Sequence, residues 1–271
     1  MVENKKPRTL VNLIGAPLLL SIIFFGGPVF TLFIFVIIFI GTFEFNNMVK
    51  IKSFSLNLYI FFTLYFIFLL NHLFPIFSNH QYNYFILLSF IGLGFSCFLI
   101  KNKLKNLYYR ILAFVWIGLL FQQAIYIRNL PEIGFKLVLC MFLSVWVTDS
   151  FAFIFGSKFG KSKILPSISP KKTWVGFIAG YIACTIFIYF LFSSGYFNNT
   201  AFEFNLIDVL ILGVISGILG QFGDFFESYF KRYFSVKDSG TLLQGHGGFL
   251  DRFDSLLFVV PLFSLYLRFV L

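Results

Sequence analysis

The chain has 271 residues, of which 59% are hydrophobic and only 12% are charged, and its mean hydropathy is +0.89. This composition excludes a soluble globular domain of the same length and indicates a membrane protein. The formal net charge of +10 mainly reflects the orientation of the chain in the membrane, because basic residues gather beside membrane helices on one side. We therefore expect no nucleic-acid partner. Lys5, Lys6 and Arg8 precede an apolar run that lacks a small-residue cleavage site, which predicts an uncleaved first helix rather than a signal peptide.

Glycine, proline and charged residues divide the uncharged runs into nine predicted helices, since one membrane crossing needs about 20 apolar residues. In chain order these helices are Leu10–Phe25, Pro28–Phe43, Phe54–Phe74, Tyr84–Ile100, Ile111–Ile127, Lys136–Phe155, Trp174–Phe192, Leu206–Phe222 and Ser255–Phe269. The weakest break is Gly26-Gly27-Pro28, without which the first two helices would form a re-entrant hairpin. The three cysteines lie in apolar runs, so no disulfide framework is expected. The predicted fold class is an all-α, polytopic integral membrane protein.

The distribution of lysine and arginine predicts how this single transmembrane domain, residues 1–271, is oriented. With a cytoplasmic N-terminus, the inner side receives 18 of the 21 basic residues and the outer side keeps only Arg128, Lys136 and Arg268. This bias follows the positive-inside rule and predicts a multi-pass protein of a bacterial-type inner (cytoplasmic) membrane. The predicted parts are an N-terminal helical half 1–133, a C-terminal half 134–271 that carries the candidate functional residues described next and, within the latter, cytoplasmic loops 156–173 and 223–254.

Five of the eleven acidic residues fall in the short segment from Asp224 to Asp254. Membrane proteins keep charges where they function, because an unpaired charge at membrane depth is costly. The first part of the segment places five polar side chains on one helical face: Asp224, Glu227, Ser228, Lys231 and Arg232. An interfacial amphipathic helix with a Glu227–Lys231 pair would explain this face equally well.

The second part of the segment favours a functional interpretation. Gly245-His246-Gly247-Gly248 permits a ligand to approach the backbone closely, and Asp251 and Asp254 follow one helical turn apart. One of these acids could be a helix N-cap, but two acids with Asp224 nearby fit a divalent-cation site of hard oxygen ligands. We therefore expect a divalent cation bound by Asp224 and Asp251, with Asp149 and Asp254 as further ligands or as partners of the ligands.

Asp149 and the loop that follows it form a second candidate element. Asp149 lies seven residues before Gly156, on the order of 10 Å inside the membrane helix at about 1.5 Å per residue. An acid at that depth is functional by default, with a structural pairing as the alternative. The upstream lysines of this loop are explained as topology anchors. Four polar residues cluster where the next helix starts: Ser169, Lys171, Lys172 and Thr173. Because helix N-termini and lysines both favour phosphate, Lys171 and Lys172 are candidate phosphate-binding residues.

Several motifs of the chain occur together in the order of a known family. The main one is Ser228-x-x-Lys231-Arg232-x4-Lys237-Asp238-x-Gly240, followed by Gly245-His246-Gly247-Gly248-x-x-Asp251-Arg252-x-Asp254. The others are Gly223-Asp224-x-x-Glu227-Ser228, Trp146-x-x-Asp149, Ser169-Pro170-Lys171-Lys172-Thr173-Trp174 and Glu44-Phe45. With these motifs the chain resembles the phosphatidate cytidylyltransferases (CDP-diacylglycerol synthases). The resemblance covers nearly the whole chain and is most specific in residues 146–176 and 220–255.

The resemblance implies Mg²⁺-dependent transfer of CMP from CTP to phosphatidic acid, which gives CDP-diacylglycerol and pyrophosphate in phospholipid biosynthesis. Its implied partners are CTP, phosphatidic acid and the lipid bilayer, and it leaves open a homodimer and a second, monovalent cation. The residues implied to be catalytic are Asp149, Lys171, Lys172, Lys231, Arg232, Lys237, Asp238, His246 and Arg252. Those implied to bind substrate are Ser169, Thr173, Ser228, Gly245, Gly247 and Gly248.

Two departures from the family pattern and two alternative functions stay open at this point. Gln244 stands where the family usually has a proline, which loosens the loop, and Val175 replaces a glutamate that would lie near the lysines. A CTP-dependent transferase or kinase acting on another membrane lipid would need the same groups. A cation-coupled transporter is more remote, because it would place its charges at the midplane of broken helices.

Overall fold

The computed structural model describes residues 6–50, 108–109, 112–198, 204–242 and 247–270. These residues form an all-helical protein without β-strands, apart from an isolated antiparallel bridge between Lys163 and Thr173. The elements are α1 (Lys6–Phe25), α2 (Gly27–Met48), the π-helix η1 (Phe114–Leu120), α6 (Gln123–Arg128), α7 (Gly134–Phe159), α8 (Trp174–Ser193), α9 (Leu206–Val214), the π-helix η2 (Ile215–Leu219), α10 (Gly220–Tyr233), the 3₁₀ helix η3 (Leu250–Arg252) and α11 (Leu256–Val270).

The all-α membrane class predicted from the sequence is confirmed, whereas the count of nine helices is not. Among the described residues, four helices are long and apolar enough to cross a membrane: Gly27–Met48, Gly134–Phe159, Trp174–Ser193 and Leu206–Tyr233. Shorter apolar helices cover Gly15–Phe25, Phe114–Arg128 and Leu256–Val270. The predicted helices Phe54–Phe74 and Tyr84–Ile100 lie outside the described residues.

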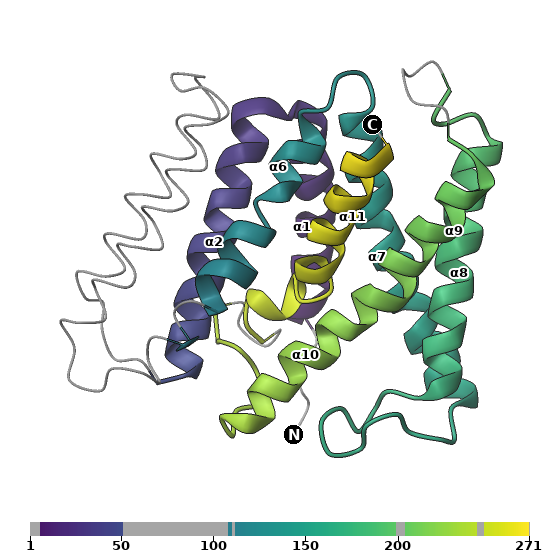
Figure 1. The fold of residues 1–271 in the computed structure, drawn as a ribbon. Coiled ribbons are helices and arrows are strands. Elements are labelled where there is room, and N and C mark those ends of the chain that lie inside the picture. The colour runs from purple at the N-terminus through teal and green to yellow at the C-terminus, as the bar shows by residue number, and fades with distance from the viewer. Residues whose placement is uncertain (1–5, 51–107, 110–111, 199–203, 243–246, 271) are drawn as a thin grey trace.

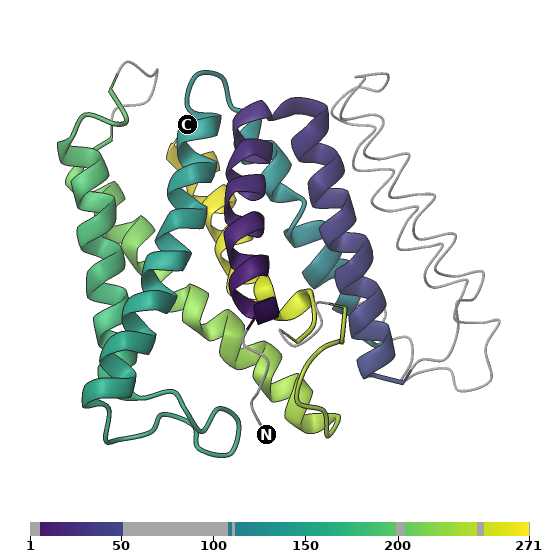
Figure 2. The same cartoon turned by 180° about the vertical axis from the view of Figure 1, so that it is seen from behind.

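The break predicted at Gly26-Gly27-Pro28 separates two antiparallel helices, as Figures 1 and 2 show. Gly26 has a φ of 61°, a left-handed conformation that glycine adopts at little cost, and Pro28 lies in the first turn of α2, where its missing N–H is not needed. Arg128 donates hydrogen bonds to the carbonyls of Ile23 and Phe24 at 2.9 and 3.1 Å. It thereby satisfies carbonyl groups that the end of α1 leaves without helical partners.

The helix predicted to end at Phe222 instead continues to Tyr233, so the acidic face belongs to the same helical run as the apolar segment. The run passes from α9 through the π-helix η2 into α10 without a loop, because Gly223, the predicted break, lies inside the helix against the backbone of Asp254 and Ser255. In Figure 1 this run crosses obliquely in front of α7 and α8. It therefore carries Asp224 from the apolar bundle to the loops.

The helices have their ends at two levels, called here the lower and upper ends as seen in Figure 1. The lower end holds the start of α1, the end of α2, the loop between α7 and α8 and the end of α10. The upper end holds the turns after α1 and α6 and the end of α11. Arg128, Lys136 and Arg268 belong to the upper end, and the lysines of the α7–α8 loop to the lower one. This arrangement agrees with the predicted charge asymmetry.

Small residues bring α7 and α8 into close contact beside the cavity that contains Asp149. A Cβ atom on Gly176 would lie 2.5 Å from the Ala152 carbonyl oxygen, and one on Gly180 would lie 2.8 Å from that of Thr148. Small residues allow membrane helices to approach this closely, and van der Waals packing then holds them together. The pair forms one wall of the cavity that contains Asp149.

Candidate active site

A cavity of about 420 Å³ opens between α7, the loop after it, α8 and α10 at the lower end. It brings together two groups of residues that the sequence predicts separately, the acids of α7 and α10 and the lysines of the loop. Thr173 and Gly176 at the start of α8 line it too. Its charged and amide-bearing residues are Asp149, Lys163, Lys171, Lys172, Gln221 and Asp224. A cavity with both fixed positive charge and carboxylates suits a phosphate ester together with a cation.

Lys172 and Asp224 form an ion pair at the wall of this cavity. Lys172 Nζ lies 2.5 Å from Asp224 Oδ2 and 4.3 Å from the centre of the Phe225 ring. Ser228 Oγ donates a 3.3 Å hydrogen bond to the other carboxylate oxygen, Asp224 Oδ1. Both charged side chains remain about a quarter exposed, at 25% and 29%. The lysine is therefore held in place and still accessible to a ligand in the cavity.

The start of α8 presents backbone N–H groups next to the lysines. Thr173 is the N-cap, and its buried hydroxyl accepts a hydrogen bond from the Gly176 N–H at 3.2 Å. The loop folds back on itself before the helix, with Trp174 N donating to Ser162 O at 3.2 Å and Ile164 N to Lys172 O at 3.2 Å. Thr173 also lines the cavity, and its hydroxyl keeps an O–H donor while it accepts the Gly176 N–H. A helix N-terminus flanked by Lys171 and Lys172 is a favourable place for a phosphate group.

Asp251 forms the centre of a second cluster, at the end of the loop that follows α10. Its Oδ1 accepts a hydrogen bond from Lys231 Nζ at 2.6 Å, and its Oδ2 accepts from the backbone N–H groups of Gly248 at 2.7 Å and Ser239 at 3.1 Å. Burial alone would raise the pKa of the Asp251 carboxyl, but these donors and the Lys231 charge outweigh it and lower the pKa. Lys231 Nζ also donates to Glu227 Oε2 at 3.1 Å. Asp251 therefore fixes the loop onto α10.

Four acids interact electrostatically, because the charges of Asp149, Asp224 and Glu227 act on Asp254. Removal of the Asp254 carboxyl from water, reinforced by the negative charges of the other three, raises its pKa well above the ordinary value. Among the described residues, no hydrogen-bond donor contacts the buried Glu227 Oε1. Within the described ranges, no three His, Cys, Asp or Glu side chains are already arranged as ligands of one ion.

The remaining predicted residues lie in several different environments. Arg232 links the loop before α8 to the loop after α10, because it donates hydrogen bonds to the Ile168 and Val236 carbonyls, each at 3.2 Å. Three residues are exposed on the loop or in η3, and one lies half-buried in the turn before α8: Lys237, Asp238, Arg252 and Ser169. Gly247 has a φ of 80°, and a Cβ there would lie 2.8 Å from Asp251 Oδ2, so the turn requires glycine. Gly245 and His246 lie outside the described residues.

The structure adds two buried residues that the predicted site does not include. Gln221 Nε2 donates to the Gly217 carbonyl at 2.6 Å and to the Phe177 carbonyl at 3.0 Å, which joins α10 to α8 under the cavity. Glu44 in α2 is 4% exposed and accepts hydrogen bonds from the loop around Asp251. The signal for Glu44 was present in the sequence, because it is an acid in a predominantly apolar helix.

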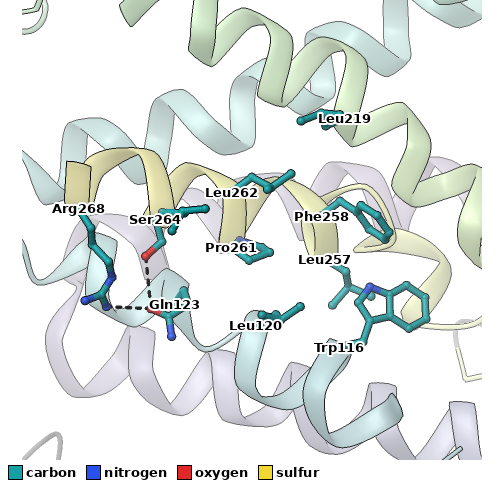
Figure 3. A pocket seen from close by; sticks show the side chains of 11 residues that line it. Trp116, Leu120, Gln123, Leu219, Leu257, Phe258, Pro261, Leu262, Ser264 and Arg268 are labelled. Carbon is teal, nitrogen blue, oxygen red and sulfur yellow. Dashed lines mark hydrogen bonds between the residues drawn. The ribbon is translucent and has the colours of Figure 1, made fainter. Parts of the chain in front are cut away.

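A larger cavity, of about 690 Å³, lies between η1, α6 and α11 and differs in character from the first. Figure 3 shows that its walls are mainly Leu, Phe and Trp side chains. Its polar groups gather at one end, where Ser264 Oγ and Arg268 Nη2 both donate to Gln123 Oε1 at 3.3 and 3.0 Å. Among the described residues, no acid lines it. The smaller cavity is therefore the one whose residues suit phosphate and cations.

Comparisons with known proteins identify a family and full-length relatives. The model of the cytidylyltransferase family matches residues 6–270. A phosphatidate cytidylyltransferase of Staphylococcus haemolyticus is 38% identical over 266 residues, covering 97% of this chain and 98% of that protein. Proteins of the same name from Staphylococcus saprophyticus and Staphylococcus aureus (strain COL) are 36% and 37% identical, with the same coverage.

Proposed function

Because the chain belongs to the cytidylyltransferase family, we propose that it transfers CMP from CTP to phosphatidic acid in the membrane. A phosphate oxygen of the lipid forms a bond to the α-phosphorus of CTP, and the bond from that phosphorus to the bridging oxygen breaks. The products are CDP-diacylglycerol and pyrophosphate. The observation that carries the proposal is the Lys172–Asp224 pair at the wall of the smaller cavity, in a chain related to phosphatidate cytidylyltransferases over 97% of its length.

The residues of the cavity suit this reaction without a strong general base. The lipid phosphate is already anionic, so the barrier comes from repulsion between anions and from charge that builds up on the leaving pyrophosphate. Lys171 and Lys172, with the N–H groups at the start of α8, offset that charge at fixed positions. Glu227 and Asp251 hold the ammonium group of Lys231 in place.

The acids fit a divalent cation by the chemistry of their donors. The four carboxyl groups offer hard oxygen atoms, and no donor among the described residues contacts the buried Glu227 Oε1. When bound, Mg²⁺ supplies further positive charge for the phosphate oxygens. We expect Asp224 and Asp254 to hold it, with Asp149 beside them. Asp224 is paired with Lys172 and Asp251 with Lys231, so each would bind the ion by exchanging its lysine for it.

The same proposal places the protein in a bacterial cytoplasmic membrane with the lower end facing the cytoplasm. The distribution of basic residues between the two ends supports this orientation. It would give the cavity access to soluble CTP from one side and to phosphatidic acid from the bilayer. A homodimer and a second, monovalent cation remain parts of the proposal that rest on the family resemblance alone.

Purified protein in detergent tests the reaction directly. With labelled CTP, phosphatidic acid and Mg²⁺, we expect CDP-diacylglycerol on thin-layer plates and one pyrophosphate per liponucleotide. Chelation of divalent ions should stop the reaction, and added Mg²⁺ should restore it. Phosphorylation of diacylglycerol or another lipid alcohol, with no liponucleotide from phosphatidic acid, would replace the proposal by a lipid kinase.

A further inference from the structure

Glu44 is a buried acid of the N-terminal half whose two carboxylate oxygens are both engaged by the C-terminal half. It lies near the end of α2 and is 4% exposed. Oε2 accepts hydrogen bonds from Ser239 Oγ at 3.0 Å and from Leu250 N at 2.8 Å, and Oε1 accepts from Phe249 N at 2.9 Å. These donors stand about 200 positions further along the chain. A charge this deep in the protein persists because several donors replace the water it loses.

The donors lie on the two sides of the glycine-rich loop, here residues 240–248, of which 243–246 lie outside the described residues. Ser239 precedes the loop, and Phe249 and Leu250 follow it, with η3 packed against α2. Gly240 and Gly248 lie so close to the Glu44 carboxylate that a Cβ atom on either residue would collide with it. The carboxylate therefore holds the residues on both sides of the loop together through its hydrogen bonds.

The hydrogen bonds that start at Glu44 extend to the candidate active site through Ser239 and Asp251. The Ser239 hydroxyl donates to Glu44, while its backbone N–H donates to Asp251 Oδ2 at 3.1 Å. Asp251 in turn holds Lys231 at 2.6 Å. One unbroken series of hydrogen bonds thus runs from Glu44 in α2 to Lys231 in α10.

We propose that Glu44 is a positioning residue of the cytidylyl-transfer site, which holds the glycine-rich loop, Asp251 and Lys231 in the arrangement that turnover requires. The proposal rests on the function proposed above. Glu44 lines neither cavity described here, so its effect on catalysis passes through the loop. A purely structural role would instead lower the stability of the protein and leave the turnover of each folded molecule unchanged.

Glu44→Gln is the main test, with Thr42→Val as a matched control. Glutamine keeps the length of the side chain, but its amide NH₂ leaves at least one buried N–H facing another donor. We expect kcat to fall about 100-fold per folded molecule, as for a displaced catalytic group, while KM for CTP changes little. Thr42 is also buried in α2, but its hydroxyl donates to the Ile38 carbonyl of its own helix at 2.7 Å. Its replacement should leave kcat unchanged.

Hydrogen exchange provides a readout that does not depend on activity. Peptides that contain Phe249 and Leu250 should exchange faster in Glu44→Gln than in the wild type or in Thr42→Val, because two N–H groups lose their charged acceptor. Unchanged exchange in these peptides together with normal kcat per folded molecule would overturn the proposal. A wild-type protein that makes no liponucleotide would instead refute the proposed function, and the exchange data would still report whether Glu44 holds the loop.

Ser239→Ala is a milder change that tests the same proposal if Glu44→Gln does not fold. This change removes one of the three hydrogen bonds to Glu44 and retains the Ser239 N–H bond to Asp251. We expect kcat to fall about tenfold, as for the loss of one hydrogen bond to a charged group. Where Glu44→Gln does fold, the double variant should lose no more kcat than Glu44→Gln alone. Losses that multiply would overturn the route through Ser239.

Discussion

Replacement of Lys172 by alanine removes the positive charge that the structure places at the wall of the smaller cavity. Lys172 Nζ is paired with Asp224 at 2.5 Å, and its side chain is 25% exposed. Two unit charges about 4 Å apart interact by about 4 kcal/mol at an effective dielectric constant of about 20. Solvent in the open cavity screens part of this interaction for a bound phosphate. We therefore expect a loss of about 2.7 kcal/mol in transition-state stabilisation, a decrease of about 100-fold in kcat/KM for CTP.

The same change should cost little stability. Exposed and partly exposed ion pairs contribute about 0 to 1 kcal/mol, so the Lys172→Ala protein should stay folded at the assay temperature. Lys172→Arg keeps the charge and should retain a larger share of the activity, although its planar fork differs from an ammonium group.

Steady-state kinetics with purified variants, at saturating phosphatidic acid and varied CTP, measure this effect. Lys161→Ala is the matched control, because Lys161 is an exposed lysine of the same loop that does not line the cavity. Its kcat/KM should equal that of the wild type. If Lys172→Ala kept kcat/KM for CTP within about threefold of the wild type, or if Lys161→Ala lost as much activity, the role of this charge would be refuted.

Three further predictions follow from the acids, the helix packing and the topology. Asp224→Asn should reduce turnover by about 100-fold or more at limiting Mg²⁺ without lowering the melting temperature, and near-normal turnover would exclude Asp224 as a ligand. Gly176→Ala should lower stability by about 1–3 kcal/mol, seen as a lower melting temperature, because its Cβ would lie 2.5 Å from the Ala152 carbonyl oxygen; an unchanged melting temperature would show that α7 and α8 can separate freely. In a cysteine-free background, Lys161→Cys should resist and Asn198→Cys should accept an impermeant thiol reagent added outside intact cells, and the reverse pattern would invert the proposed orientation.

The sequence predicts most of the helices because the cost of exposing polar groups to lipid acts on each segment separately. An apolar run between charged breaks must be helical whatever its neighbours are, so α7, α8 and α11 begin and end within a few residues of their predicted bounds. The break at Phe222 was wrong for a related reason. Gly223 looks like a stop in a one-dimensional pattern, whereas in the fold it is the small residue that lets α10 approach the start of α11.

The candidate residues could also be chosen from the sequence, since charges are rare in such a chain and are kept for a purpose. Their partners could not, because contacts between segments that are tens to about 200 residues apart leave no periodic pattern in either segment. Only the tertiary structure joins Lys172 to Asp224 and Glu44 to Ser239. Asp251 shows the difference most clearly. Its sequence position marks it as an acid of the site, but the fold surrounds it with Lys231 and two backbone N–H groups, and that environment decides whether it holds a loop or an ion.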